Sequence, residues 1–153
     1  MPGYFFDTSA LAKLYHAEPG SEYVEDLFST MGSKGLVSPL SLVEMESEFA
    51  IKVRTGVLDE KGRLLALRRF RADIVRHRVT VGPLRARHYR SAAKLMRVHA
   101  VSSGSRSLDA LQLAVAFNMQ ETSEISVIVS ADRRLCEVAR ICGCPAIDPV
   151  NPA

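Results

Sequence analysis

The chain has 153 residues, of which 47% are hydrophobic and 24% charged, a composition typical of one folded domain spanning residues 1–153. No apolar run approaches the roughly 20 residues that cross a bilayer, and the first residues lack a signal-peptide pattern. Three cysteines, an odd number, argue against a disulfide framework and favour a reducing compartment. We therefore expect a single cytoplasmic domain with no membrane segment.

The net charge of +3 is small, but the charges are unevenly distributed. Residues 52–97 contain 14 of the 20 Lys and Arg residues and only three of the 17 acids. Most of these cations are arginines, whose planar guanidinium suits phosphate. Solvated helix faces account for many of them, so the segregation favours a polyanionic partner without specifying it.

Apolar runs alternate with segments of helical periodicity along the chain. In chain order, the pattern predicts a strand at 3–7, helices at 9–16 and 21–31, a strand at 36–38, helices at 39–55 and 59–74, a strand at 79–81, a helix at 83–100, a flexible linker at 101–106, a helix at 107–118 capped by Ser107, a strand at 125–129, a helix at 131–141 and a strand at 146–147. Strands separated by helices form βαβ units. The predicted fold class is α/β, a three-layer α/β/α sandwich around a mostly parallel sheet of four to five strands.

Four acidic residues fall where strands end or helices begin. Asp7 leaves the first strand, Glu44 lies on the helix after the second strand, Asp109 opens a helix, and Asp132 follows the strand at 125–129. Ligands bind at the carboxyl edge of such sheets. Helix capping and solvated faces explain each acid separately. Clustered carboxylates, however, repel one another unless a cation lies between them, and these hard oxygen ligands suit Mg²⁺ or Mn²⁺.

Four ordered segments resemble the PIN-domain family, and in particular the toxin ribonucleases of VapBC toxin–antitoxin pairs. These segments are 4–15, 41–44, 108–114 and 129–135, followed by a final strand at 146–149. The resemblance implies a PIN fold in which Asp7, Glu44, Asp109 and Asp132 form an acidic pocket for one or two divalent ions, with Asp7 and Asp109 as the foremost ligands. The polar residues before Asp109 depart from the family pattern, as does Ser130, where the family often has Thr.

What the resemblance implies is a Mg²⁺- or Mn²⁺-dependent endoribonuclease that hydrolyses RNA phosphodiester bonds with a metal-activated water. Arg133 and Arg134 are then candidates for binding a flanking phosphate, with a solvent-exposed pair as the alternative explanation. Thr8, Ser9 and Ser130 are candidates for orienting the carboxylates. The family also implies a small antitoxin as partner, a homodimer and a higher assembly with the antitoxin.

Other functional classes fit the residues less well. A haloacid-dehalogenase-type phosphatase needs an Asp where Ser9 stands, and a receiver domain needs a late lysine, whereas the last lysine is Lys94. No glycine-rich nucleotide loop is present. Three histidines spaced eleven residues apart, and the pair Cys142 and Cys144, lack the spacing of a metal site. The alternative that remains is a PIN-like module that binds RNA or protein without cleaving.

Overall fold

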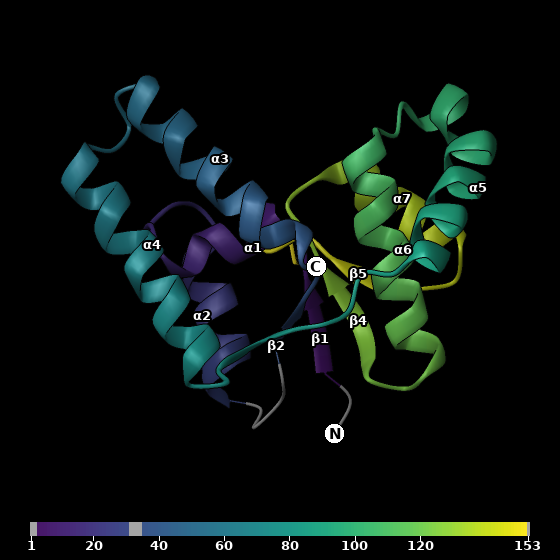
Figure 1. Ribbon diagram of the computed structural model, residues 1–153, viewed down its shortest axis with the longest axis horizontal. Coiled ribbons are helices and arrows are strands. Elements are labelled where there is room, and N and C mark those ends of the chain that lie inside the picture. The colour runs from purple at the N-terminus through teal and green to yellow at the C-terminus, as the bar shows by residue number, and fades with distance from the viewer. Residues whose placement is uncertain (1–2, 31–34, 153) are drawn as a thin grey trace.

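The computed structural model describes residues 3–30 and 35–152. Within them a five-stranded sheet has the order β3-β2-β1-β4-β5, and every neighbouring pair is parallel (Figure 1). The strands are β1 (Gly3–Phe6), β2 (Gly35–Val37), β3 (Val79–Val81), β4 (Ile125–Val129) and β5 (Ala146–Ile147). The predicted α/β class is confirmed, and the sheet is parallel throughout.

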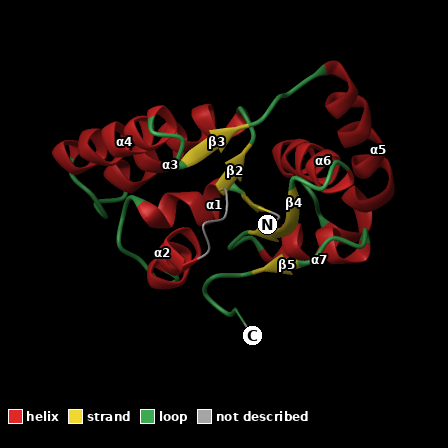
Figure 2. Ribbon diagram, turned by 90° about the horizontal axis from the view of Figure 1, so that it is seen from below, coloured by secondary structure: helices red, strands yellow, loops and turns green. Residues whose placement is uncertain are grey.

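Helices cover both faces of the sheet, which gives the three predicted layers. They are α1 (Thr8–Leu11), the 3-10 turn η1 (Ala12–Leu14), α2 (Ser21–Thr30), α3 (Leu40–Arg54), α4 (Glu60–Val75), α5 (Ala86–Ser103), α6 (Ser107–Glu121) and α7 (Arg133–Ile141). Figures 1 and 2 show α1–α4 on one side and α5–α7 on the other. No helix in the described part of the chain is long and apolar enough to span a bilayer.

Strand β1 is held from both faces because successive side chains of a strand point in opposite directions. Phe6 enters one core with Met45 and Phe49, whereas Phe5 enters the other with Leu113 and Ile128. Both phenylalanines are 1% exposed, and burying each side chain contributes about 1.5–3 kcal/mol. The end of β1 therefore has a well-defined position in the centre of the sheet.

The order of the strands places a crevice beside that end. The chain moves outward from β1 to β2 and β3 and then returns to β4, which pairs with the other side of β1. Between β1 and β4 the winding of the sheet reverses, and ligands bind outside the carboxyl ends of strands at such switch points. The backbone N–H of Asp7 donates to the carbonyl of Val129 at 3.1 Å, which ties this edge together.

The first predicted helix differs from the structure for an identifiable reason. The helix expected at 9–16 is α-helical only to Leu11 and then tightens into η1. This turn buries Lys13 against Glu18, at 3.2 Å, and lets the Tyr15 hydroxyl donate to Asp73 at 2.8 Å. The helix expected at 21–31 ends at Thr30 among the described residues, and Met31 lies outside them.

The linker predicted at 101–106 is shorter than expected. Helix α5 continues to Ser103 and ends at Gly104, whose φ of 65° suits glycine in the left-handed region. Val101, the apolar residue of this last turn, is fully exposed. The turn therefore shows no periodic apolar pattern from which a helix could be predicted. Arg106, and not Ser107, is the N-cap of α6, and no side-chain hydrogen bond caps that helix.

Candidate acidic active site

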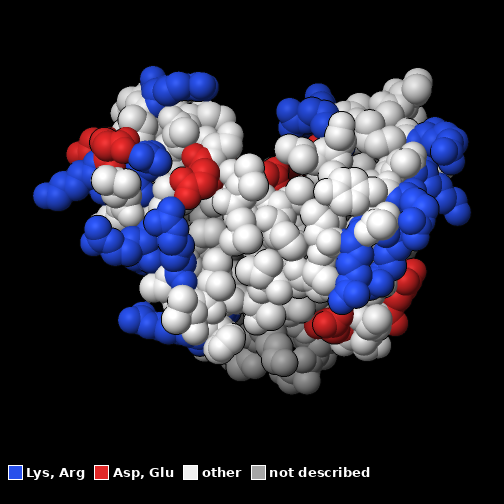
Figure 3. Space-filling model, in the orientation of Figure 1, with Lys and Arg blue, Asp and Glu red and all other residues white. Residues whose placement is uncertain are grey.

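The structure brings the four predicted acids together. Asp7, Glu44, Asp109 and Asp132 line one cavity of about 370 Å³ at the carboxyl edge of the sheet. They come from the end of β1, from α3, from the first turn of α6 and from the N-cap of α7. Figure 3 shows a hollow at the top of the molecule with acidic side chains in it. Four separate elements thus converge on one acidic cavity.

Asp7 is the most buried of these acids, at 6% exposure. Its Oδ1 accepts from the Ser9 backbone N–H at 2.7 Å, and its Oδ2 accepts from the hydroxyls of Ser9, at 3.1 Å, and Ser130. Burial raises the pKa of Asp7 to about 6, although these hydrogen bonds act in the opposite direction. Asp7 is therefore a weaker acid than an ordinary aspartate.

Glu44 is held by a buried amide. Gln112 donates to Glu44 Oε1 at 2.6 Å, and Thr8 donates to the same oxygen at 3.2 Å. Because the carboxylate of Glu44 only accepts, the amide nitrogen of Gln112 must face it. The amide oxygen of Gln112 then accepts from Ser38 Oγ at 2.9 Å. Burial raises the pKa of Glu44, and the charge of Asp109 adds to the rise. Two hydrogen bonds thus fix the position of Glu44 Oε1, and Glu44 is a weaker acid than an ordinary glutamate.

Arg106 lies between the other two acids. Its Nε is 3.6 Å from Asp109 Oδ2, and its Nη2 is 3.9 Å from Asp132 Oδ2. Asp132 Oδ1 caps α7 by accepting from the N–H groups of Arg134 and Leu135. Burial, followed by the charge of Asp132, raises the pKa of Asp109, and Arg106 opposes this rise. A cation of the chain itself therefore bridges the outer pair of carboxylates.

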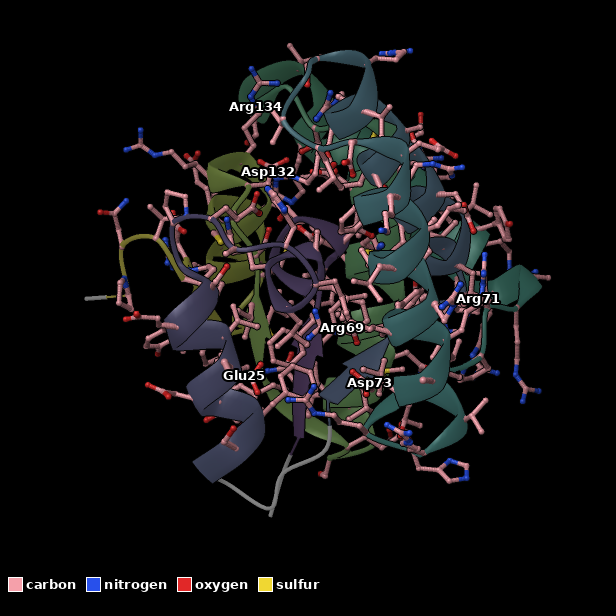
Figure 4. The ribbon with its side chains drawn as sticks, turned by 90° about the vertical axis from the view of Figure 1, so that its left-hand side faces the viewer. Glu25, Arg69, Arg71, Asp73, Asp132 and Arg134 are labelled. Atoms are coloured by element: carbon pink, nitrogen blue, oxygen red, sulfur yellow. The ribbon has the colours of Figure 1, made fainter. Side chains whose placement is uncertain are left out.

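The remaining predicted site residues lie in two places. Thr8 and Ser9 line the cavity, and Ser130 lies fully buried behind Asp7. Arg133 and Arg134 are exposed at the start of α7 and do not line it. Figure 4 shows Asp132 and Arg134 at the same upper end of the molecule. Among the described residues, the arginine on the cavity wall is Arg106.

This arrangement agrees with the sequence pattern of one known family. The pattern of the PIN domain matches residues 4–141, which is most of the chain. The chain belongs to the PIN domain family. No curated protein matches its sequence.

Three solved structures share the architecture of this PIN domain at low sequence identity. VapC20 from Mycobacterium tuberculosis, a sarcin–ricin loop cleaving toxin, is 19% identical, with a TM-score of 0.65 over 93% of this chain and 96% of that chain. FitAcB from Neisseria gonorrhoeae is 16% identical, with a TM-score of 0.65 over 95% and 97% of the two chains. PAE2754 from Pyrobaculum aerophilum is 21% identical, with a TM-score of 0.56 over 90% and 84%. At these identities the similarity shows a common fold.

Two buried lysines of the PIN domain lie behind the wall that carries Glu44. Lys13 and Lys52 are 8% and 9% exposed and share the carboxylate of Glu18, at 3.2 and 2.9 Å. Lys52 also reaches Glu48, which lines the cavity, at 3.5 Å. The lysines lower the pKa of Glu18, although its burial acts the other way. This shared ion pair joins η1, the Glu18 loop and α3 beneath the acidic cavity.

Gln112 and Arg106 contact the acids of the site but were not predicted from the sequence as site residues. Gln112 is 2% exposed and is the one amide within the apolar run Ala110–Ala116. A lone amide in such a run needs a buried hydrogen-bond partner. This requirement could have indicated that Gln112 contacts a polar group of the site. Arg106 precedes Asp109 by three residues, a spacing that brings side chains together near a helix start. Its location in a predicted linker concealed this spacing.

The oxygen donors of this PIN domain suit a hard divalent cation in chemistry. Burial is the largest cause of the raised pKa values of Asp7, Glu44 and Asp109, and a bound cation would lower all three. Within residues 3–30 and 35–152, however, no three Asp, Glu, His or Cys side chains are close enough together to surround one ion. Mg²⁺ is commonly bound by one or two carboxylates and several waters, and the carboxylates of this cavity fit such a coordination.

Proposed function

We propose that this PIN domain is a divalent-metal-dependent endoribonuclease and the toxin of a toxin–antitoxin pair acting in the cytoplasm. The observation that carries the proposal is the convergence of four carboxylates from four elements on one cavity at the switch point of the sheet. An Asp7 carboxyl with a pKa near 6 in such a cavity is typical of a functional group and unusual for a helix cap.

Each acid has a distinct role in this proposal. Asp7 and Asp109 would be the main ligands of Mg²⁺ or Mn²⁺, and Asp132 would hold one of the waters of the ion. The ion would supply a water of lowered pKa and would stabilise charge on the phosphoryl oxygens. Glu44, whose pKa is raised, would orient the attacking water or contribute to a second ion.

Other side chains would support these carboxylates and the substrate. Ser9 and Ser130 donate hydrogen bonds to Asp7 and would hold it in place, as Thr8 and Gln112 would hold Glu44. Arg106 on the cavity wall, with Arg133 and Arg134 beside it, would bind phosphates that flank the scissile bond. The similar fold of VapC20, a sarcin–ricin loop cleaving toxin, supports RNA as the substrate class.

Exposed apolar side chains on the α3–α4 hairpin support protein partners, for which we propose an antitoxin and a second copy of the chain. Seven large apolar residues there are between 43% and 77% exposed: Leu42, Val43, Ile51, Val57, Leu64, Leu65 and Val75. Exposed apolar side chains gathered on one helical hairpin favour an interaction surface. Co-expression with the small neighbouring gene is expected to relieve growth inhibition, and harmless expression of this chain alone would argue against the toxin role.

The nuclease activity is tested by cleavage of RNA in Mg²⁺ or Mn²⁺, with and without chelator. Asp7→Asn and Glu44→Gln are expected to slow cleavage by at least ~100-fold, since each removes a charge from the proposed metal site. Glu46→Gln is the matched control because Glu46 lies on the same helix, pairs with Arg71 at 2.8 Å and does not line the cavity. Tight RNA binding without metal-dependent cleavage would instead support the non-cleaving module.

A further inference from the structure

Helix α5 carries an unusual charge distribution. It has no acidic residue, and its cations Arg87, Arg90, Lys94 and Arg97 recur at spacings of three and four residues along one face. Figure 3 shows Lys and Arg side chains in a band over α5 on the right-hand side. None of the four forms an ion pair with a described residue, whereas on the α4 flank seen in Figure 4 Arg71 pairs with Glu46. The α5 face thus has uncompensated positive charge.

A cavity of about 480 Å³ opens between α5 and α6, beside this face. Arg87 and Lys94 line it together with the apolar side chains of Leu95, Val98 and Phe117. Figure 2 shows α5 packed on the outer side of α6. The cavity shares no described lining residue with the acidic cavity. Its volume and mixed lining are those of a small-molecule site.

A hydrogen-bond network fixes a donor on the wall of this cavity. Arg87 Nη2 donates to Asn118 Oδ1 at 3.0 Å, and because arginine only donates, the atom facing it must be the oxygen. The buried His88 accepts from the Arg85 N–H at Nδ1, so its Nε2 carries the proton donated to the same Oδ1, at 3.1 Å. The Nδ2 group of Asn118 then has no partner among the described residues and remains available to a ligand.

We propose that the α5–α6 cavity binds a phosphorylated nucleoside. Arg87 and Lys94 provide two cations for the phosphate, against one carboxylate, Glu121, on the wall. The ring of Phe117 provides an apolar face for a base, and Asn118 Nδ2 provides a donor for a ring nitrogen or carbonyl.

Simpler ligands match only some of the groups that line this cavity. An acyl chain with a carboxylate head leaves the free amide of Asn118 without an acceptor, which is unfavourable once water is displaced. Inorganic phosphate occupies the cationic end and leaves the apolar side chains of Leu95, Val98 and Phe117 in contact with water. A nucleoside with its phosphate satisfies all three kinds of group at once.

The nucleotide can be free in solution or part of a single-stranded RNA chain. The RNA source rests on the proposed function, whereas the nucleotide site itself does not. As a part of RNA, a nucleotide bound here would lie outside the acidic cavity and would extend the contact of the enzyme with its substrate along α5.

The site is tested with adenosine 5′-monophosphate and the full chain in chelator at about 0.15 M salt, where charges further apart than about 8 Å are largely screened. Amide resonances in ¹⁵N-labelled protein are expected to shift in the segments 87–99 and 114–121. Titration is expected to give an affinity for the nucleotide at least tenfold above those for inorganic phosphate and for adenosine. Equal affinities for the nucleotide and inorganic phosphate, no binding, or shifts confined to the acidic cavity would overturn the proposal.

Two variants of one helix separate the cavity from general charge. Lys94→Glu is expected to weaken nucleotide binding at least tenfold, whereas Arg97→Glu is expected to change it less than threefold. Arg97 is the matched control because it is also exposed on α5 but does not line the cavity. Equal losses from both variants would show that only the overall charge matters and would refute a defined site. Circular dichroism establishes that both variants are folded.

A single-stranded RNA octamer then identifies the source. Displacement of the nucleotide by the octamer, with loss of that competition in Lys94→Glu, supports a subsite for the RNA chain. Binding of the nucleotide without displacement supports a free nucleotide as the ligand. The cleavage assay with Asp7→Asn reports on the acidic cavity alone, so failure of the proposed function and failure of this site are distinguishable.

Discussion

Substitution of the buried carboxylate Asp7 by asparagine is expected to stabilise the metal-free protein. The pKa of Asp7 is about 6 in the folded chain, against an ordinary 3.8. At about 1.4 kcal/mol for each pKa unit, this difference corresponds to about 3 kcal/mol of destabilisation when the carboxyl is ionised. Asp7→Asn removes this destabilisation, but part of the benefit is lost because hydrogen bonds to a neutral amide are weaker than those to a carboxylate. We therefore expect the free energy of unfolding of Asp7→Asn to be about 1–3 kcal/mol higher at neutral pH.

The dependence on pH has a definite sign. The folded chain binds this proton more tightly than the unfolded chain does, so the contribution of Asp7 to the free energy of unfolding is most favourable below about pH 4. That contribution is lost as the pH rises through about 6, the folded pKa. The D7N protein lacks the titrating group and is expected to have a flatter stability profile between about pH 4 and pH 7.

Urea denaturation in chelator, at several values between about pH 4 and pH 8, measures this difference. Asp59→Asn is the matched control, since Asp59 is an exposed N-cap that accepts from the Gly62 N–H at 2.7 Å. Asparagine caps helices equally well, and the control is expected to stay within about 0.5 kcal/mol of the natural protein. A D7N protein that is less stable at pH 7.5, or that keeps the pH slope of the natural protein, would refute the reasoning.

Three further substitutions test the buried ion pair of Glu18, the hydrogen bond to Glu44 and the packing of β2. Glu18→Gln removes the charge that two buried lysines share and is expected to lower the free energy of unfolding by about 2–4 kcal/mol in urea denaturation, and an unchanged midpoint would contradict this. Gln112→Met removes the donor to Glu44, and single-turnover cleavage of RNA is expected to slow about tenfold or more with little change in melting temperature; an unaltered rate would show that the hydrogen bond has no role. Gly35→Ala places a Cβ 2.3 Å from the ring of Phe28, so calorimetry is expected to show a loss of about 1–3 kcal/mol, and a natural melting temperature would argue against the clash.

Much of the fold follows from local apolar patterns. The apolar runs at β1 and β4 are typical of strands that are buried on both faces. The helical spacing of Met45 and Phe49 predicted α3. The grouping of the acids was predictable because all parallel strands end at one edge. The last turn of α5 was not predictable, because its Val101 is fully exposed and contributes no periodic burial.

The polar partners within the site were harder to predict than the acids. Gln112 meets Glu44 and Ser38, which lie 68 and 74 residues away in sequence. No spacing within one element encodes such a contact, since it depends on how α6 packs against α3. The positions of acids at element ends are local properties, whereas the hydrogen bonds that orient those acids are tertiary ones.

The two larger of the three buried apolar clusters have a consequence for how the protein is made. Except for Val129, the buried cluster around Phe6 comes entirely from residues before β4, so most of that core is available early in translation. The second cluster needs Phe5 and Leu36 together with residues from Leu113 onward. Asp109 and Asp132 belong to this later part. Because folding during synthesis proceeds from the N-terminus, the nascent chain can bury most of the Phe6 cluster while the acidic cavity is still without two of its carboxylates.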